Sequence, residues 1–381
     1  MSIKLDTIAL NKTLETIKNL NEIILDFTAF TVNINKSYIA NNQYKITKKY
    51  NLHETIKNKI YGLEKLEIKQ IYFENEECEK KDMYVPIMSI MFNSKLLHND
   101  YLSGLNKNNI DIALQNLIKP LENIIKLSKR IILNNFQVGY VDFTENIKID
   151  TQYTICDYLK AIEYGTEIKR GLKQINTRFV NEGTLYFDLS YKNNYKFYDK
   201  QKDINDTIKS RKNTVNKQFY TEYNNLLAKS NNILRCEIRF NNKNHRLYKL
   251  LNIPKTKKIT LNKLLNSNLK NNVPYSELKR FSSIDTYHKI IYELKNNDIK
   301  NYFDLLIGYA INNIYFNSKK ESPITELKKD ISESSINKSK QTKYNNIKKA
   351  ILLHRKYLTT QKNKIDYLSI YNDLLNRLKQ G

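Results

Sequence analysis

Short runs in which apolar and polar residues alternate predict β-strands in the first two thirds of the chain. Residues 69–77 (KQIYFENEE) and 83–93 (MYVPIMSIMFN) are rich in Ile, Val, Tyr and Phe, and the charged stretch ECEKKD between them predicts a hairpin loop. These two strands are therefore expected to pair. Similar patterns predict a strand over 136–149, a hairpin over 183–201 that turns at 192–194, and a strand over 232–242.

Apolar residues at helical spacing predict helices in the other segments. Residues 109–134 form one such segment, with Pro120 as the expected kink or restart, and a helix over 154–165 is expected to stop near Gly165. Another helix is predicted over 206–230. From about residue 256 the strand signals vanish and helical spacing dominates, apart from a polar run over 319–341 that is typical of a loop or link.

These elements predict an α+β fold with an antiparallel sheet and flanking helices, followed by an all-helical C-terminal region. A chain of 381 residues, 40% of them hydrophobic, can bury a substantial core and is expected to form two domains. We place an α+β domain at 1–250 and a helical domain at 251–381, the latter containing the polar loop near 319–341.

The charge balance indicates the class of partner. The chain has 64 Lys and Arg against 39 Asp and Glu, a formal charge of +25, which points to a polyanion and first to nucleic acid. Lys, Asn and Ile are abundant throughout, as in AT-rich coding, which accounts for part of the lysine excess. The 3 cysteines are widely spaced and fit a reducing cytoplasm. No signal peptide or membrane-spanning run is visible, so no membrane association is expected.

The run NNYKFYDKQKDI (193–204) holds Tyr198 between Lys196 and Lys200. In an extended strand these three side chains share one face, so the tyrosine would lie in a positive pocket. Positive charge favours phenolate over phenol and attracts phosphate, which suits a tyrosine that attacks a phosphodiester. Ordinary basic surface is the alternative, because a chain with 28 Tyr and many Lys produces such neighbours by chance.

Two other predicted strands carry polar residues within an apolar alternation. Along LRCEIRF (234–240), Arg235, Glu237 and Arg239 share one face, and Asp142 in VGYVDF points away from its two apolar neighbours. If these strands lie beside the Tyr198 strand, one face would combine a nucleophile, phosphate clamps that include Lys196, and carboxylates able to hold a divalent metal ion. The commoner arrangement of such residues is a solvated face with cross-strand salt bridges.

His98 follows an apolar run and precedes Asn99 and Asp100, where either a metal ligand or a loop-capping residue fits. The other four histidines have no metal-ligand spacing with one another. The chain contains no GxxxxGK[ST], GxSxG or HExxH motif, so motor ATPase, serine hydrolase and zinc protease chemistry are not supported.

Five segments occur in the order seen in one family of replication proteins: IKLDTIAL, NSKLLHNDYLSGLNKNNIDIAL, VGYVDFTENI, GTLYFDLSYKNNYKFYDKQKDI and LRCEIRF. Over residues 3–242 the chain resembles the rolling-circle initiators of the filamentous-phage gene II/X kind and their plasmid Rep relatives. The resemblance implies an HUH-endonuclease-like sheet, a bound Mg²⁺ or Mn²⁺, and a metal-dependent nickase with strand-joining activity. Its tyrosine would join the 5′ phosphate at the nick and leave a 3′-OH for synthesis.

The resemblance also implies roles for individual residues. Tyr198 matches the nucleophile and Lys200 its companion lysine, while the expected metal ligands are Asp142, Glu237 and His98. The expected DNA contacts are Lys196, Arg235 and Arg239. The chain departs from the family pattern in having no His-apolar-His pair and Leu97 instead of Gly before His98. Other tyrosines near enough to replace Tyr198 as nucleophile are Tyr186, Tyr191 and Tyr195.

The expected partners are single- and double-stranded origin DNA, with the C-terminal helices contacting the origin duplex or a host helicase. A non-catalytic, basic DNA-binding initiator or regulator is the alternative, and it predicts a Tyr198 buried in a core far from Asp142 and Glu237. RNA binding is less favoured because no RNP-type aromatic motif is present. A tyrosine recombinase needs His-x-x-Arg, whereas Arg355 directly follows His354.

Overall fold

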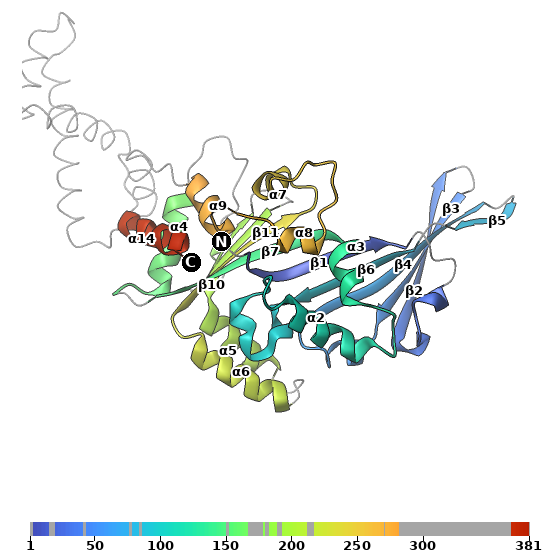
Figure 1. The fold of residues 1–381 in the computed structure, drawn as a ribbon, viewed down its shortest axis with the longest axis horizontal. Helices are drawn as coiled ribbons and strands as arrows, with labels where there is room; N and C mark the ends of the chain where they lie inside the picture. Colours follow the sequence, from blue (N-terminus) through green and yellow to red (C-terminus); the bar gives the residue numbers. More distant parts are fainter. Residues whose placement is uncertain are drawn as a thin grey trace, which may run out of the picture. The chain divides into compact units, whose positions relative to one another are not determined.

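The structure is a computed structural model that describes residues 3–14, 20–40, 43–75, 78–83, 86–149, 152–166, 178–179, 183–188, 193–211, 217–269, 271–281 and 367–380. These residues form an α+β fold built on one antiparallel sheet, as the sequence predicts (Figure 1). None of the helices within these ranges has the length and apolar content needed to cross a bilayer.

The sheet contains eleven strands within the described part of the chain. Their order is β2-β3-β4-β6-β1-β7-β11-β10-β9-β8, and β5 pairs with β4 beside this path. The strands are β1 (Leu5–Thr13), β2 (Phe30–Ala40), β3 (Gln43–Leu52), β4 (Leu63–Asn75), β5 (Cys78–Met83), β6 (Ile87–Asn93), β7 (Gln137–Lys148), β8 (Arg178–Phe179), β9 (Thr184–Asp188), β10 (Asn193–Asp199) and β11 (Ile233–Asn241).

Helices cover the sheet and connect its strands. The α-helices are α1 (Glu54–Lys57), α2 (Ile110–Ile118), α3 (Lys129–Asn135), α4 (Ile155–Thr166), α5 (Lys200–Arg211), α6 (Lys217–Lys229), α7 (His245–Leu251), α8 (Leu261–Leu265), α9 (Val273–Phe281) and α14 (Tyr367–Gln380). The 3₁₀ helices are η1 (Leu20–Glu22), η2 (Phe27–Ala29), η3 (Ser94–Ser103) and η4 (Lys119–Leu121).

Several predicted elements are confirmed. β7, α4 and β11 lie where the sequence places them, and Pro120 falls in η4, between α2 and α3. The predicted hairpin is formed by β9 and β10, which pair Asp188 with Asn194. Its connection, including Tyr191, lies outside the described residues. The helix predicted over 206–230 is two helices, α5 and α6, and the first begins already at Lys200.

The hairpin loop predicted over residues 77–82 is wrong. Cys78–Met83 forms β5, which pairs with the outer part of β4, while β4 and β6 pair as expected. The long β4 strand offers backbone N–H and C=O groups with which CEKKDM can pair. This pairing overcomes the low strand propensity of CEKKDM, since strand formation depends strongly on context. The sequence analysis also did not identify β2 and β3, because their alternating positions mix apolar residues with Lys, Thr and Asn.

The two faces of β10 and β11 have different environments. On one face Tyr195 and Phe197 lie opposite Ile238 and Cys236, and all four side chains are buried. The Tyr195 hydroxyl donates a hydrogen bond to Glu277 of α9 at 2.7 Å, so this face packs against helices. Because strand side chains alternate, the other face carries the polar residues of both strands.

The chain divides into two compact units. Residues 1–159, 171–280 and 372–381 form the first, which holds every described strand, and residues 160–170 and 281–371 form the second. The second unit lies almost wholly outside the described residues, as does the predicted loop over 319–341. The helical character of 251–381 is seen in α8, α9 and α14, and for the remainder of that region it stays a prediction.

A glycine substitution tests the packing of η3 against the sheet. Gly62 has φ +100°, and a Cβ at this position would lie 2.6 Å from the backbone nitrogen of Leu96 in η3. We expect Gly62→Ala to lower the free energy of unfolding by about 1–3 kcal/mol in urea titration. Gly183→Ala is the matched control, since its nearest neighbour is the flexible Lys202 side chain, and a change within about 0.5 kcal/mol is expected. Equal losses in the two variants would contradict this account.

Candidate active site

Three adjacent strands place the predicted polar residues on one face of the sheet. In an antiparallel pair, directly opposed residues point to the same side. The opposed pairs are Lys196 with Glu237 and Tyr198 with Arg235 between β10 and β11, and Asp142 with Arg239 between β7 and β11. The shared face that the alternation predicts is therefore confirmed.

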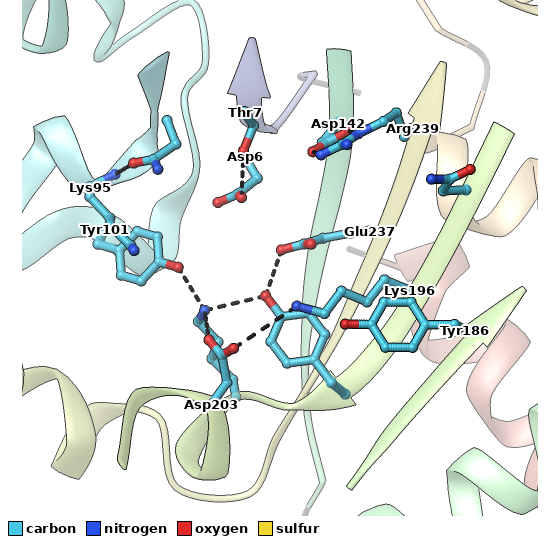
Figure 2. A pocket seen from close by; sticks show the side chains of 14 residues that line it. Asp6, Thr7, Lys95, Tyr101, Asp142, Tyr186, Lys196, Asp203, Glu237 and Arg239 are labelled. Atoms are coloured by element: carbon cyan, nitrogen blue, oxygen red, sulfur yellow. Dashed lines mark hydrogen bonds and ion pairs between the residues drawn. The ribbon is translucent and has the colours of Figure 1, made fainter. Parts of the chain in front are cut away.

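A pocket of about 380 Å³ opens on this face, and Figure 2 shows its lining side chains converging from several elements. The sheet contributes Asp142, Tyr186, Asn194, Lys196, Tyr198, Glu237 and Arg239. The other lining residues are Asp6 and Thr7 of β1, Asn93 at the end of β6, Lys95 and Tyr101 of η3, and Lys200 and Asp203 of α5. The pocket thus combines carboxylates, cationic side chains and tyrosines.

A bulge in β1 brings Asp6 into this group. Between β1 and β7, Leu5 pairs with Phe143 and Ile8 with Val141, so two residues of β1 lie opposite the single residue Asp142. A bulge of this kind redirects side chains locally and is common beside active sites. Asp6 and Thr7 therefore both line the pocket, although they are consecutive in the strand.

The Tyr198 hydroxyl lies between the Glu237 carboxylate and the Lys200 amino group. It donates a hydrogen bond to Glu237 Oε1 at 2.6 Å, and Lys200 Nζ donates to the hydroxyl oxygen at 3.3 Å. Lys196 Nζ lies 3.9 Å from the centroid of the Tyr198 ring. The Tyr198 side chain lines the pocket but is only 3% exposed. The hydroxyl is therefore held in a fixed orientation, with a carboxylate ready to accept its proton.

The protonation of Tyr198 differs from the sequence expectation. Burial, followed by the charge of Glu237, raises the pKa of Tyr198 well above its ordinary value, and Arg235 opposes this shift only in part. The sequence shows the neighbouring lysines but not the desolvation, which disfavours the phenolate. Tyr198 is therefore a neutral phenol at neutral pH and needs a general base before it can attack.

Lys200 is a buried ammonium group with three oxygen acceptors. Its side chain is 1% exposed, and Nζ donates to Tyr101 OH at 2.6 Å and to Asp203 Oδ2 at 2.7 Å, in addition to Tyr198. Three donors thus meet three acceptors, which is the condition for burying such a charge at tolerable cost. Because α5 begins at Lys200, the end of β10 and the start of the helix fix this residue against the nucleophile candidate.

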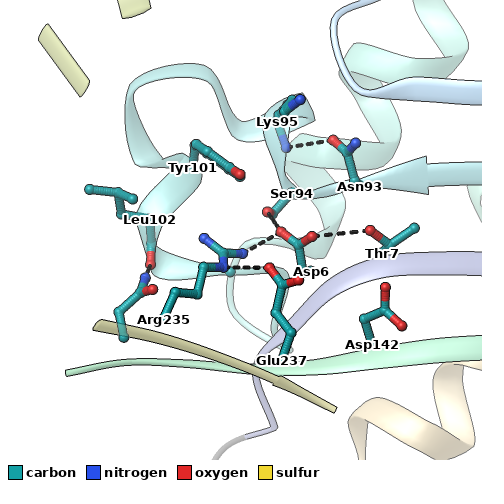
Figure 3. A network of polar contacts seen from close by, with 12 residues as sticks. Asp6, Thr7, Asn93, Ser94, Lys95, Tyr101, Leu102, Asp142, Arg235 and Glu237 are labelled. Carbon is teal, nitrogen blue, oxygen red and sulfur yellow. Dashed lines mark hydrogen bonds and ion pairs between the residues drawn. The ribbon is translucent and has the colours of Figure 1, made fainter. Parts of the chain in front are cut away.

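Arg235 lies beneath the pocket rather than in it. Its side chain is fully buried, its Nη2 pairs with Asp6, and its Nε lies 2.8 Å from Glu237 Oε1 (Figure 3). Ser94 also donates a hydrogen bond to Asp6, at 2.7 Å. Burial would raise the pKa of Asp6, but Arg235 and Lys200 outweigh it and lower the pKa to about 2. Arg235, expected to contact DNA, has no exposed surface for that and positions Asp6 and Glu237 instead.

Asp142 and Arg239 form the second ion pair of the face. Arg239 Nε and Nη2 each donate to one oxygen of the Asp142 carboxylate at 2.6 Å. Burial raises the pKa of Asp142 to about 6, with Glu237 and Asp6 adding to the rise and Arg239 opposing it. The Arg239 side chain is 42% exposed and lines the pocket, so it is accessible to an anionic ligand.

The carboxylates of this face do not form a ready-made metal centre. Within the described part of the chain, no group of three or more His, Cys, Asp or Glu side chains is arranged to hold a metal ion. Asp6 and Asp142 already accept from Arg235 and Arg239, and Glu237 accepts from Tyr198. Oxygen ligands for Mg²⁺ or Mn²⁺ are thus present but engaged, and the Mg²⁺ or Mn²⁺ requirement stays a prediction.

His98, the third expected metal ligand, is not among the residues that line the pocket. Its Nδ1 lies 3.0 Å from Glu222 Oε2 of α6, and its ring stacks on Tyr61 with centroids 5.9 Å apart. The residue adopts φ 52° and ψ −115° inside η3, a conformation that is unusual for a non-glycine residue. The structure therefore does not bring His98 together with Asp142 and Glu237.

The structure separates the alternative tyrosines. Tyr195 lies on the opposite face of the sheet, with its hydroxyl on Glu277, so it is not at the pocket. Tyr186 does line the pocket and is 37% exposed. Tyr191 lies outside the described residues. Tyr198 and Tyr186 are the described members of this set that reach the pocket.

Sequence reasoning missed several residues of the site. Tyr101 and Lys95 come from the 3₁₀ segment η3, and Asp203 from the first turn of α5, so no strand alternation marks them. Asp6 did leave a signal, because it is a lone acid within the apolar run IKLDTIAL. A carboxylate removed from water needs a cation nearby. Arg235, which lies in another apolar strand, is the cation that pairs with Asp6.

The chain was compared with known proteins at the level of families, individual proteins and solved structures. Residues 103–260 match the family model described as the N-terminal region of the phage gene II replication-associated protein. No curated protein matches, and no solved structure matches, so an HUH-endonuclease-like fold stays a prediction. The matched region carries Asp142, Tyr198, Lys200 and Glu237. The match over residues 103–260 supports a filamentous-phage gene II-like rolling-circle replication initiator.

Proposed function

We propose that this pocket nicks one strand of phage or plasmid origin DNA through Tyr198. The observation that carries the proposal is the hydrogen bond of 2.6 Å from the Tyr198 hydroxyl to Glu237, formed inside a cationic pocket. A nucleophile in contact with a base is the arrangement that covalent catalysis requires. The family match supports the role of a rolling-circle replication initiator, which is a role that this reaction would serve.

The proposed reaction begins with proton transfer from the Tyr198 hydroxyl to Glu237 Oε1. The phenolate oxygen then forms a bond to the phosphorus, and the bond from phosphorus to the 3′ oxygen breaks. The 3′ oxygen takes up a proton from solvent, so the products are a 5′-phosphotyrosine and a free 3′-OH. Lys200, 3.3 Å from the hydroxyl oxygen, stabilises the negative charge as it develops. Strand joining is the reverse sequence.

Arg239 and Lys196 are the residues proposed to hold the scissile phosphate. Their side chains are 42% and 28% exposed and both line the pocket. Such contacts make binding salt-dependent and carry no sequence information themselves. Single- and double-stranded origin DNA are the proposed partners, and contact with a host helicase stays a prediction.

A non-catalytic DNA-binding initiator is the second candidate. Its favouring observation is that Tyr198 is only 3% exposed, as that candidate predicts. Its other expectation, that Glu237 lies far from Tyr198, disagrees with the 2.6 Å hydrogen bond. An attack on DNA therefore requires the strand to enter the pocket and reach the hydroxyl.

The first test identifies the nucleophile. Full-length protein and Mn²⁺ are incubated with 5′- or 3′-labelled single-stranded oligonucleotides tiling its own replicon's suspected origin, and products are resolved on denaturing gels. We expect a covalent adduct on the 5′ phosphate at the break, carried by the 3′-labelled fragment, that is lost in Tyr198→Phe and retained in Tyr186→Phe. If the two variants behave the other way round, Tyr186 is the nucleophile. Binding without any adduct from the wild-type protein would support the non-catalytic candidate.

The second test concerns the general base. Glu237→Gln keeps the size of the side chain but cannot accept the Tyr198 proton, so we expect adduct formation to slow by about 10²–10⁴-fold in single-turnover assays. The loss should shrink as pH rises, because hydroxide can then replace the missing base. Oligonucleotide affinity should be unchanged or slightly higher, since one negative charge is removed. An adduct rate within about twofold of wild type would remove Glu237 from this role.

The third test concerns the metal ion. We expect adduct formation to be abolished by EDTA and restored by Mn²⁺ or Mg²⁺. Burial raises the pKa of Asp142, and the nearby Glu237 and Asp6 carboxylates add to the rise, so an added cation is favoured there. Equilibrium dialysis of radiolabelled Mn²⁺ with wild-type and Asp142→Asn protein, with and without oligonucleotide, separates metal binding from cleavage. Full activity in EDTA would show that the basic side chains suffice.

A further inference from the structure

A second surface of the sheet, remote from the pocket strands, has the composition of a nucleic-acid platform. It is formed by β2, β3 and the outer part of β4, and in Figure 1 the strands β3 and β5 extend beyond the rest of the sheet at this end. We call it the β2–β3 arm. The whole arm precedes residues 103–260, so the family match does not cover it.

The strand register defines one face of the arm. Across β2, β3 and β4 the aligned rows on this face are Val32 with Tyr50 and Ile68, Ile34 with Lys48 and Gln70, and Lys36 with Ile46 and Tyr72; Tyr38 with Tyr44 continues the pattern outward. The inner row is anchored in the core by Tyr50 and Ile68, which are buried. Outward from it, rings, aliphatic side chains and lysines alternate.

The β2 side chains on this face are exposed, whereas Tyr50, Ile68 and Gln70 on the inner strands are buried. Val32 is 42%, Ile34 65% and Tyr38 60% exposed, high values for three apolar or aromatic residues on one face of a single strand. An exposed apolar group of this kind marks an interaction surface more often than a solvated one. β2 has no neighbour on its outer edge among the described strands.

Lysines lie among the rings. Lys36 Nζ is 4.3 Å from the centroid of Tyr44, Lys48 Nζ is 5.1 Å from that of Tyr50, and the Tyr38 and Tyr44 rings meet edge to face at 5.5 Å. Together β2 and β3 contain the four lysines 36, 45, 48 and 49 and no Asp or Glu. On β4 the register places one acid, Glu74, opposite Tyr44. Lys36 and Lys48 outnumber it on this face, which favours an anionic partner that presents flat apolar groups to the rings.

We propose that this face of the β2–β3 arm binds single-stranded DNA, with lysines on the phosphates and tyrosines against the bases. Rings and cations along an exposed sheet are what sequence-tolerant single-strand binding uses, because every base has a flat face. Duplex DNA fits this face less well, since its bases are stacked on one another and are not available to exposed rings. The proposal goes beyond nicking: the arm would hold a strand that the pocket does not cut.

The opposite face of the same strands supplies a matched control. Lys45 and Lys49 lie one residue out of phase with Lys48 and with Tyr44, so they point to the other side of β3. Replacing them removes the same two charges from the same arm. Lys36→Ala/Lys48→Ala and Lys45→Ala/Lys49→Ala therefore differ in face and not in net charge.

The test measures binding of a fluorescein-labelled oligothymidylate, which contains no origin sequence, to full-length Tyr198→Phe protein by anisotropy. We expect Tyr38→Ala/Tyr44→Ala to weaken binding about tenfold or more and Lys36→Ala/Lys48→Ala to weaken it and flatten its salt dependence. Lys45→Ala/Lys49→Ala should weaken it about threefold at most, through long-range charge alone. Circular dichroism melting checks that each variant is folded.

Four results would overturn the proposal. Equal losses of affinity for the two lysine pairs would show that binding depends on non-specific charge. Duplex DNA would be the ligand if a labelled duplex binds more tightly than the single strand and its affinity falls as much in the tyrosine variant. If the tyrosine variant binds the oligonucleotide normally but no longer sediments with anionic phospholipid vesicles, the face binds a membrane. If it binds the oligonucleotide normally but no longer self-associates, the face binds a second copy of the chain. Adduct formation by the corresponding Tyr198-containing proteins is scored separately, so failure of the arm and failure of the nicking proposal are distinguishable.

Discussion

The buried guanidinium of Arg235 is the charge on which the geometry of the site depends. It lies between Asp6 of β1 and Glu237 of β11, and β7 separates these two strands in the sheet. A cation without exposed surface has to be compensated by nearby anions, and an isolated one would cost several kcal/mol. The bulge that admits Asp6 and the orientation of Glu237 are both set by this requirement. Tyr198, which donates to Glu237, takes its position from the same charge.

The remaining charges of the pocket alternate in sign around that centre. Asp142 faces Arg239, and Lys200 faces Asp203, so the free protein neutralises its own cations. An incoming phosphate has to compete with a carboxylate for Arg239, the more exposed of these side chains. The same arrangement keeps Tyr198 protonated, because burial and the charge of Glu237 raise its pKa and together outweigh the opposing charge of Arg235. Such a pocket can bind an anionic ligand through its cationic side chains, and its own carboxylates compensate these cations when no ligand is bound.

Strand alternation predicted which residues share a face within each strand, because the side-chain period is two. That Asp142, Tyr198, Glu237 and Arg239 share one face also depends on β7, β11 and β10 being neighbours in this register, a condition that the structure meets. It did not predict Asp6, which depends on a bulge, or Tyr101 and Asp203, which come from helical segments brought in by tertiary packing. It also gave the wrong direction for the pKa of Tyr198, since burial is not visible in a sequence. The strands β2 and β3 were missed because Lys, Thr and Asn are mixed with the apolar residues along them, which weakens the strand pattern.

The pair formed by Arg235 and Asp6 has a consequence for the smallest piece of this chain that could stand alone. The family-matched residues 103–260 contain Arg235 but not Asp6, Ser94 or Tyr101. A fragment cut at those boundaries would lack β1, leave β7 with an open edge and bury a guanidinium with only Glu237 to compensate it. Loss of one partner from such a pair costs about 3–5 kcal/mol, a large share of a domain's total stability. The smallest stable fragment of this fold therefore has to extend beyond the family-matched residues 103–260 and include β1.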